Sequence, residues 1–144
     1  MRYNDTGKVV IRYAKGVKWG LKQLVERILE NLSTRDVFLF RIRCGACGGA
    51  YATRAIRFSK AGLTPPTKEK QILFDAVYEQ ELRGARQLAV SEAAQQVNYC
   101  PICKRLVCNS CFMICEDLDM CGQCASRLHE KGVPVLSEVL EAVM

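Results

Sequence analysis

Eight of the nine cysteines in this chain form four Cys-x-x-Cys pairs, and this pattern constrains the fold more than any other feature. The pairs are Cys44/Cys47, Cys100/Cys103, Cys108/Cys111 and Cys121/Cys124. A Cys-x-x-Cys turn presents two thiolates to one ion, and two such turns complete a tetrahedral four-cysteine site. The sequence therefore predicts two structural Zn²⁺ ions, each held by four cysteines.

The spacing of the pairs leaves two arrangements open. Only four residues separate Cys103 from Cys108, so one ion held by the second and third pairs would require a very tight loop. We favour an interleaved arrangement over a sequential one, in which the first pair joins the second and the third joins the fourth. The interleaved sites are Cys44, Cys47, Cys108 and Cys111 (site 1) and Cys100, Cys103, Cys121 and Cys124 (site 2).

The composition is that of a globular protein from a reducing compartment. Hydrophobic residues make up 49% of the chain and charged residues 25%, which is ordinary for such proteins. No apolar run reaches the ~20 residues that span a bilayer, and the first residues lead into no apolar segment of the signal-peptide type. An odd number of cysteines, nine, fits metal binding better than full disulfide pairing. We expect a cytoplasmic protein, with redox use of the pairs as the less favoured alternative.

Basic residues concentrate in the first part of the chain. Residues 1–60 contain thirteen Lys and Arg against four Asp and Glu, whereas residues 61–144 contain eight against eleven. With Lys15, Lys18 and Lys22, the arginines of the predicted strands would form a surface for phosphates or an acidic partner. The alternative is an ordinary solvated face. The candidate residues are Arg12, Arg41, Arg43, Arg54 and Arg57.

The pattern of apolar residues predicts an α+β fold that begins with a small antiparallel sheet. Residues 8–13 are rich in β-branched residues and predict a short strand, and residues 17–32 carry apolar residues at helical spacing. Residues 37–43 alternate between apolar and basic side chains, and residues 50–59 would return antiparallel to them. The glycine-rich Cys44–Cys47 segment between these strands predicts a zinc knuckle at the tip of a β-hairpin.

A long helix is expected over about residues 66–97, after a Pro-Pro turn. Its apolar stripe, in steps of three and four residues, predicts packing within the chain rather than an oligomer seam. The stripe consists of Phe74, Tyr78, Leu82, Ala85, Ala89, Ala93 and Val97.

The rest of the chain predicts a small metal-stabilised module. Residues 123–131 are expected to form a short helix that Gly132 would end, and residues 138–144 are expected to form a last short helix that Ser137 can cap. The chain thus divides into a basic α+β region, residues 1–97, and a cysteine-rich zinc module, residues 98–144, which together form one compact unit.

The cysteine spacing carries a resemblance. The block from Cys100-Pro-Ile-Cys103 through Cys108-Asn-Ser-Cys111-Phe to Cys121-Gly-Gln-Cys124-Ala is similar to cross-brace (treble-clef) zinc fingers of the FYVE and RING type, and to zinc-ribbon tails of uncharacterised bacterial proteins. It covers residues 100–125 with the detached Cys44/Cys47, and it implies two all-cysteine zinc sites. The basic cluster with which FYVE domains bind phosphoinositides is not matched at residues 104–107, and the histidine usual among RING ligands is replaced by cysteine.

For two further residues, Cys115 and His129, we expect no role as metal ligands. Cys115, the cysteine outside the four Cys-x-x-Cys pairs, is expected to be a buried structural thiol. His129, the one histidine, is expected to be exposed or at a helix end rather than a ligand. Catalytic zinc usually has histidine or carboxylate ligands and an open position. We therefore expect a non-enzymatic binding or adaptor protein that acts through protein contacts, with nucleic-acid binding as the alternative.

Overall fold

The structure is a computed structural model that describes residues 16–135 of the 144-residue chain. The strand expected at residues 8–13 and the helix expected at residues 138–144 lie outside the described residues. The same holds for Arg12 and Lys15, and for the side chain of Lys18.

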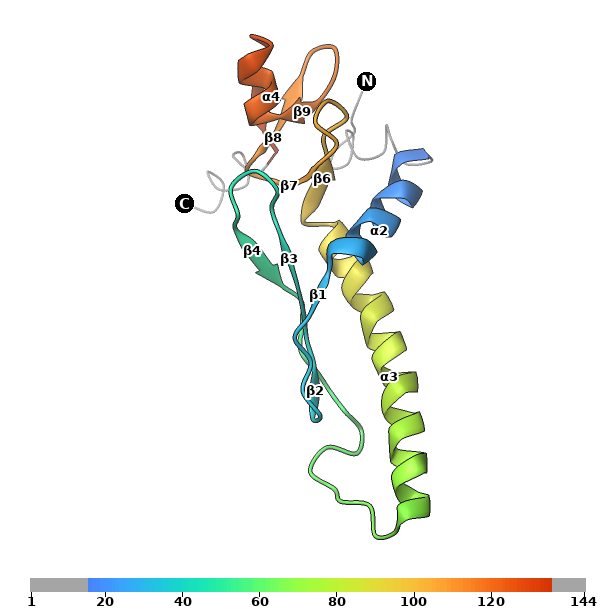
Figure 1. The fold of residues 1–144 in the computed structure, drawn as a ribbon. Coiled ribbons are helices and arrows are strands. Elements are labelled where there is room, and N and C mark those ends of the chain that lie inside the picture. The colour runs from blue at the N-terminus through green and yellow to red at the C-terminus, as the bar shows by residue number, and fades with distance from the viewer. Residues whose placement is uncertain (1–15, 136–144) are drawn as a thin grey trace.

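The described part has the expected α+β architecture, with short antiparallel sheets beside one long helix (Figure 1). The helices are α2 (Gly16–Ile28), α3 (Lys68–Ala94) and α4 (Gly122–Arg127). The molecule is elongated: α3 runs along the strands, and the cysteine-rich C-terminal part lies at one end, beside the tip of the β3–β4 hairpin. The strands are β1 (Glu30–Asn31), β2 (Val37–Phe38), β3 (Phe40–Arg43), β4 (Ala50–Ala52), β5 (Ile56–Arg57), β6 (Val97–Tyr99), β7 (Leu106–Cys108), β8 (Phe112–Cys115), β9 (Met120–Cys121) and β10 (Gly132–Pro134).

Within residues 16–135 the strands form four small sheets rather than one. Two have three strands, in the orders β1-β3-β4 and β10-β8-β9, and the pairs β2-β5 and β6-β7 form the other two. All of the pairings are antiparallel. The Cys44–Cys47 turn joins β3 to β4, so the expected hairpin with cysteines at its tip is confirmed.

The alternation in residues 37–43 positions the core as predicted. Phe38, Phe40 and Ile42 are each 1% exposed, because they share one face of the extended chain. The expected continuous strand is wrong, however, since it divides at Leu39: β2 pairs with β5, and β3 pairs with β1 and β4. The return segment 50–59 divides in the same way, between β4 and β5.

The long helix α3 is shorter than the expected 66–97. Thr67 is its N-cap, and its side chain accepts a hydrogen bond from the Lys70 amide at 3.1 Å, a common helix start. The helix ends at Ala94 because Val97 leaves it to pair with Cys108 in the β6–β7 ladder. The expected burial of the alanine-rich half is confirmed: Ala85, Ala89 and Ala93 all belong to the core.

The first helix also ends earlier than the expected residue 32. Glu30 and Asn31 leave α2 and pair with Arg41 and Phe40 in the β1–β3 ladder. Val25, near the end of the helix, is completely buried. The sequence pattern did not separate helix from strand here, because apolar spacing alone does not mark where β pairing takes over.

The C-terminal part differs from expectation after α4. The helix spans Gly122–Arg127 rather than residues 123–131. Gly132 does not end a helix but begins β10, whose residues pair with Met113–Cys115 of β8. The Val133–Pro134 segment, expected as a break in the chain, is therefore part of a strand that pairs with β8.

Two hydrophobic cores hold the molecule. The first packs α2 and α3 against β2 and β3, with the aromatic side chains of Phe38, Phe40 and Phe58 at its centre. The second core surrounds the cysteines of the C-terminal part. It includes Phe112 and also Cys44, which comes from the tip of the β3–β4 hairpin. This second core places both groups of cysteines at one end of the molecule.

Candidate metal centres

The eight paired cysteines gather into two groups of four. The four Sγ atoms of each group lie within 4.8 Å of one another. The grouping is the interleaved one, and the sequential alternative is wrong because it would separate thiols that are neighbours here. Site 1 consists of Cys44, Cys47, Cys108 and Cys111, and site 2 consists of Cys100, Cys103, Cys121 and Cys124.

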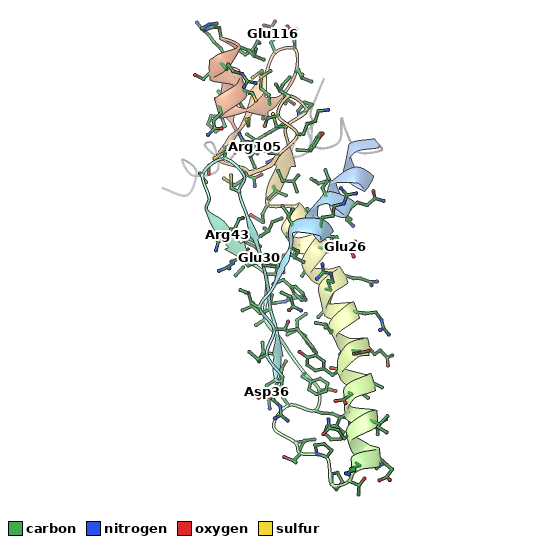
Figure 2. The ribbon with its side chains drawn as sticks, viewed as in Figure 1. Glu26, Glu30, Asp36, Arg43, Arg105 and Glu116 are labelled. Carbon is green, nitrogen blue, oxygen red and sulfur yellow. The ribbon has the colours of Figure 1, made fainter. Side chains whose placement is uncertain are left out.

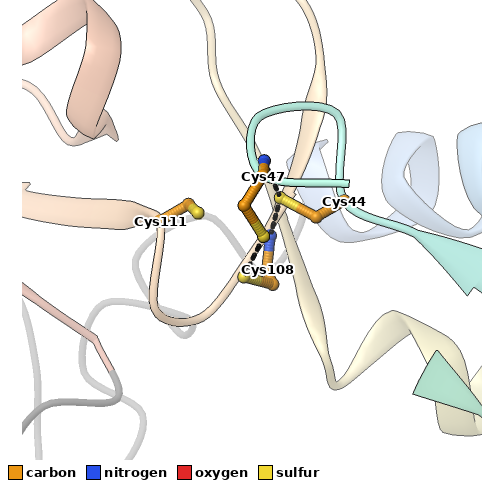
Figure 3. Close-up of side chains that lie close together, drawn as sticks. All are labelled: Cys44, Cys47, Cys108 and Cys111. Atoms are coloured by element: carbon orange, nitrogen blue, oxygen red, sulfur yellow. Dashed lines mark hydrogen bonds between the residues drawn. The ribbon is translucent and has the colours of Figure 1, made fainter. Parts of the chain in front are cut away.

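Site 1 joins the tip of the β3–β4 hairpin to the turn between β7 and β8 (Figure 3). The Sγ atoms of Cys47 and Cys108 are 3.9 Å apart. Cys44 Sγ accepts hydrogen bonds from the backbone amides of Ala46 (3.3 Å), Cys47 (3.4 Å) and Cys108 (3.2 Å). Cys44 is buried, whereas Cys47 is exposed.

Site 2 lies between the turn that joins β6 to β7 and the start of α4. The Sγ atoms of Cys103 and Cys121 are 3.8 Å apart, and Cys100 Sγ accepts a hydrogen bond of 3.3 Å from the Cys121 amide. Cys121 is the N-cap of α4, and its Sγ accepts a hydrogen bond from the Cys124 amide at 3.4 Å. Cys100, Cys121 and Cys124 are buried, so this site is more enclosed than site 1.

One cysteine pair of each site, Cys44/Cys47 in site 1 and Cys100/Cys103 in site 2, lies in a knuckle with the same backbone hydrogen bonds. In both knuckles the amide of the first cysteine donates to the carbonyl five residues later, and the amide four residues later donates back to the carbonyl of the first cysteine. These bonds, donor first, are Cys44–Gly49 (2.8 Å), Gly48–Cys44 (3.0 Å), Cys100–Arg105 (2.9 Å) and Lys104–Cys100 (2.8 Å). The turn thereby holds its two thiols on one side of the backbone.

The sulfur positions fit a tetrahedral ion of the size of Zn²⁺. With Zn–S bonds of about 2.3 Å, a tetrahedron separates its sulfurs by about 3.8 Å. The two Sγ···Sγ distances of 3.9 and 3.8 Å match this spacing. Each group could hold a metal ion, and its four thiols would fill the coordination sphere of that ion.

The pKa values of the thiols diverge within each site. At Cys44, burial opposes ionisation, but the backbone amides of Cys47, Cys108 and Ala46 outweigh it and lower the pKa to about 6. Burial raises the pKa of Cys111, and hydrogen bonds with the neighbouring thiols raise it further. Four thiolates in such close contact repel one another, and a divalent cation between them would allow all four to ionise.

Site 2 shows the same divergence, with arginine side chains involved. Burial opposes ionisation of Cys103, but hydrogen bonds from the Arg105 side chain and backbone lower its pKa to about 6. Burial raises the pKa of Cys124 to about 12, together with hydrogen bonds to the other three thiols. Arg105 Nε donates to Cys103 Sγ at 3.2 Å, and an Nη of Arg127 donates to Cys124 Sγ at 3.7 Å.

Of the four described arginines of the proposed binding surface, two share an acidic neighbour. Arg41 and Arg43 share a face of β3, but Glu30 lies beside both, at 2.6 Å from Arg41 Nε and 3.5 Å from Arg43 Nε (Figure 2). The hydrogen bond from Arg41 is the largest of the effects that lower the pKa of Glu30. Arg54 and Arg57 are exposed on the following segment. The structure thus brings the first two together with an acidic partner.

Cys115 and His129 belong to neither site. Cys115 is buried in the second core, as expected, and its amide donates to Asp119 Oδ1 at 3.0 Å. His129 is exposed just beyond the end of α4, also as expected. Sequence reasoning missed Arg105 as part of site 2, although its place directly after the second knuckle was a signal that could have found it.

Comparisons with known proteins give no family for this chain. It matches no protein family, and neither the curated proteins nor the solved structures contain a significant match. Among the described residues, no helix combines the length and the apolar character that crossing a membrane requires.

Proposed function

We propose that this protein is a zinc-stabilised, non-enzymatic binding protein that acts through protein–protein contacts. Each site would hold one Zn²⁺ with four thiolates, a ligand set typical of structural zinc, whereas catalytic zinc keeps a position open for water or substrate. Eight ionised thiols also require a reducing compartment, which supports a cytoplasmic location. In this proposal the metal ions keep the fold together and a surface elsewhere performs the function.

A groove at the end of the molecule opposite the cysteines is the observation that supports this proposal best. It encloses about 530 Å³ between the first half of α3 and the loops that flank β2 and β5. Phe58, Phe74 and Tyr78 line it, and Leu63, which is 56% exposed, stands at its edge. Aromatic side chains in a recess are the usual anchors of protein interfaces.

Charged side chains surround this groove with both signs. Arg35 and Asp36 lie in the loop before β2, and Lys60 and Asp75 line the groove from the other two segments. Lys60 Nζ also lies 5.2 Å from the centre of the Phe74 ring. An apolar recess with a mixed polar rim suits a protein surface better than the uniformly negative backbone of a nucleic acid.

Binding of nucleic acid through the strand arginines remains the alternative. The basic excess of residues 1–60 favours it, but Glu30 offsets part of the charge at Arg41 and Arg43. This function predicts a steep decrease of affinity with salt concentration. The protein-binding function predicts weaker salt dependence and sensitivity to the apolar groove.

Native mass spectrometry of the protein isolated from its own cells at low salt tests both functions. We expect two bound Zn²⁺ and a retained protein partner, which is lost in Leu63→Asp and Phe74→Ala and kept in Arg41→Glu/Arg43→Glu. Ile72→Asp is the matched control, because Ile72 is 70% exposed on the same helix and does not line the groove. Co-isolated nucleic acid that is lost in the arginine variant would contradict the proposal.

A further inference from the structure

Arg105, which is labelled in Figure 2, hydrogen-bonds to residues of both cysteine sites. On the side of site 2, its Nε lies 3.2 Å from Cys103 Sγ and an Nη lies 3.9 Å from Cys121 Sγ. On the side of site 1, its other Nη donates to the carbonyl oxygen of Gly45, at 2.6 Å. Gly45 lies between the two knuckle ligands of site 1, so one guanidinium connects the two centres.

The backbone around Arg105 makes a second link in the same place. The Gly45 amide donates to the Leu106 carbonyl at 2.8 Å. A Cβ at Gly45 would lie 3.0 Å from that carbonyl oxygen and 3.3 Å from Arg105 Cβ, closer than side chains normally approach. The hairpin tip that carries Cys44 and Cys47 therefore rests directly on residues 105–106.

Residues of site 2 hydrogen-bond to Arg105 and so hold the backbone on which the hairpin tip lies. The carbonyl of Arg105 accepts a hydrogen bond from the Cys100 amide, which closes the second knuckle. The Gln123 side chain, next to the ligand Cys124, accepts a further hydrogen bond from Arg105 at 2.6 Å. Residues from both halves of site 2 thus hold the arginine that contacts the hairpin tip.

The two sites also differ in how far apart their ligands lie in the sequence. Cys103 and Cys121 of site 2 are 18 residues apart, whereas Cys47 and Cys108 of site 1 are 61 residues apart. By loop-closure entropy alone, the longer loop is about sixfold less probable to close. Site 2 can therefore form first, from a local segment, and then help to bring the hairpin tip into place.

We propose that Arg105 couples the two metal sites, so that metal in site 2 organises Arg105 and thereby raises the metal affinity of site 1. The inference rests on the proposed occupancy of both cysteine sites and is independent of the partner. Arg105 is a positioning residue here: in site 1 it touches the knuckle backbone and no ligand sulfur. Arg127 offers a matched control, because within residues 16–135 its side chain hydrogen-bonds to Cys124 of site 2 and to no residue of site 1.

Stepwise Co²⁺ binding to the purified full-length chain tests the coupling. The thiolate–cobalt absorption bands give the two affinities in competition with a chelator, and protection of cysteines from alkylation at one equivalent identifies the site that fills first. We expect site 2 to fill first in the unmodified protein. Arg105→Leu should weaken the second step about tenfold or more, as loss of a group outside the ligand shell often does, whereas Arg127→Leu should weaken only the first.

Two further variants cover a failure of Arg105→Leu to fold. Arg105→Lys keeps a positive charge near Cys103 but cannot reach Gly45 and Gln123 together. Gly45→Ala displaces the hairpin tip from residues 105–106 and keeps the arginine itself. Both should weaken the second step. Gly45→Ala should leave the first step within about twofold of the unmodified protein, and Arg105→Lys, which loses hydrogen bonds to site 2, should weaken the first step less than the second. The proposal is overturned if these variants weaken only the first step, if neither step changes, or if site 1 fills first. None of these results bears on the partner-binding proposal, which has its own measurement.

Discussion

Gly48 and Lys104 occupy equivalent positions in the two cysteine knuckles and share a left-handed backbone, with φ values of 77° and 63°. Each lies four residues after the first cysteine of its knuckle, and each donates its amide to the carbonyl of that cysteine. Glycine adopts this conformation without a penalty, whereas an L-residue with a Cβ is strained. One knuckle therefore has the favoured residue at this position, and the other does not.

Exchanging the residue types at these two positions should have opposite effects. Lys104→Gly removes the strain and should stabilise the protein by about 0.5–1 kcal/mol. Gly48→Ala should destabilise it by about 1 kcal/mol through the backbone alone, since no atom lies within 4 Å of the added Cβ. The free energy of unfolding, measured by chemical denaturation of the metal-loaded protein, checks both. A loss of stability in Lys104→Gly would mean that the lysine side chain matters more than its backbone.

Glu92 should stabilise the fold in a pH-dependent way. It accepts hydrogen bonds from the Tyr51 hydroxyl at 2.6 Å and from the Arg54 amide at 3.1 Å, which connects α3 to β4 and the segment after it. The Tyr51 bond is the main cause that lowers the pKa of Glu92, and the same bond is the main cause that raises the pKa of Tyr51. We expect Glu92→Gln to cost about 1–2 kcal/mol at pH 7.

The sign of the pH dependence follows from the lowered pKa of Glu92. Its contribution is complete above the pKa of the carboxyl in the unfolded chain, about 4.3, and is lost as the pH falls through the lower folded-state value. The difference in unfolding free energy between the unmodified protein and Glu92→Gln should therefore shrink below about pH 4.3. Measuring both proteins in the same buffers cancels the pH dependence of the shared thiols, and a constant difference from pH 7 to pH 3 would contradict the assignment.

The aromatic cluster of Phe38, Phe58 and Tyr78 should supply a large share of the stability of the first core. Phe38 is 1% exposed, and its ring lies 5.9 Å from that of Phe58 and 5.1 Å from that of Tyr78, centre to centre. Phe38→Ala should cost about 3–5 kcal/mol, because it removes buried area and leaves a cavity. Ile72→Ala, at a position that is 70% exposed, should stay within about 0.5 kcal/mol. Urea denaturation with constant metal content compares the two, and similar midpoints would contradict this account.

Metal should leave site 1 before site 2. Cys47 is exposed, and the donors to the thiolates of site 1 among residues 16–135 are backbone amides, whereas Arg105 and Arg127 donate to thiolates of site 2. A chelator should therefore release zinc in two phases of one equivalent each. The absorbance of a colorimetric chelator reports the two phases of zinc release. Cys47→Ser removes a ligand of site 1, so the faster phase should be lost and the slower phase should remain. Release of both equivalents in a single phase would show that the sites are equally stable.

The candidate metal sites were predictable from the sequence to an unusual degree, because a Cys-x-x-Cys turn is a local structure. Its two thiols are brought together by three peptide units, whatever the rest of the chain does. The knuckle at Cys44–Cys47 and the flanking strands followed from the glycines and from the alternation of Phe38, Phe40 and Ile42. The short tether between Cys103 and Cys108 argued against one ion held by the second and third pairs. The interleaved grouping was then preferred over the sequential one because it ties the front hairpin to the C-terminal module.

The element boundaries were less predictable, because strand pairing decided them. Val97 continues the apolar stripe of the long helix and yet belongs to β6, since Cys108 lies opposite it in the ladder. Gly132 resembles a helix stop and yet begins β10. The sequence next to Val97 or Gly132 does not indicate these strand partners, because they lie 11 to 17 residues away in the chain and only folding brings them together.

The sequence by itself determined the number of cysteine pairs, the α+β class and the position of the knuckle hairpin, since each depends on residues a few positions apart. Only the tertiary structure decided which side chains meet across the molecule. It placed Glu30 against Arg41 and Arg43, where the sequence left a basic binding surface and an ordinary solvated face as alternatives, and it set Arg105 between two cysteine sites. The physical reason is that charge and hydrogen bonding act through space over a few ångströms, and separation along the chain does not reveal those distances.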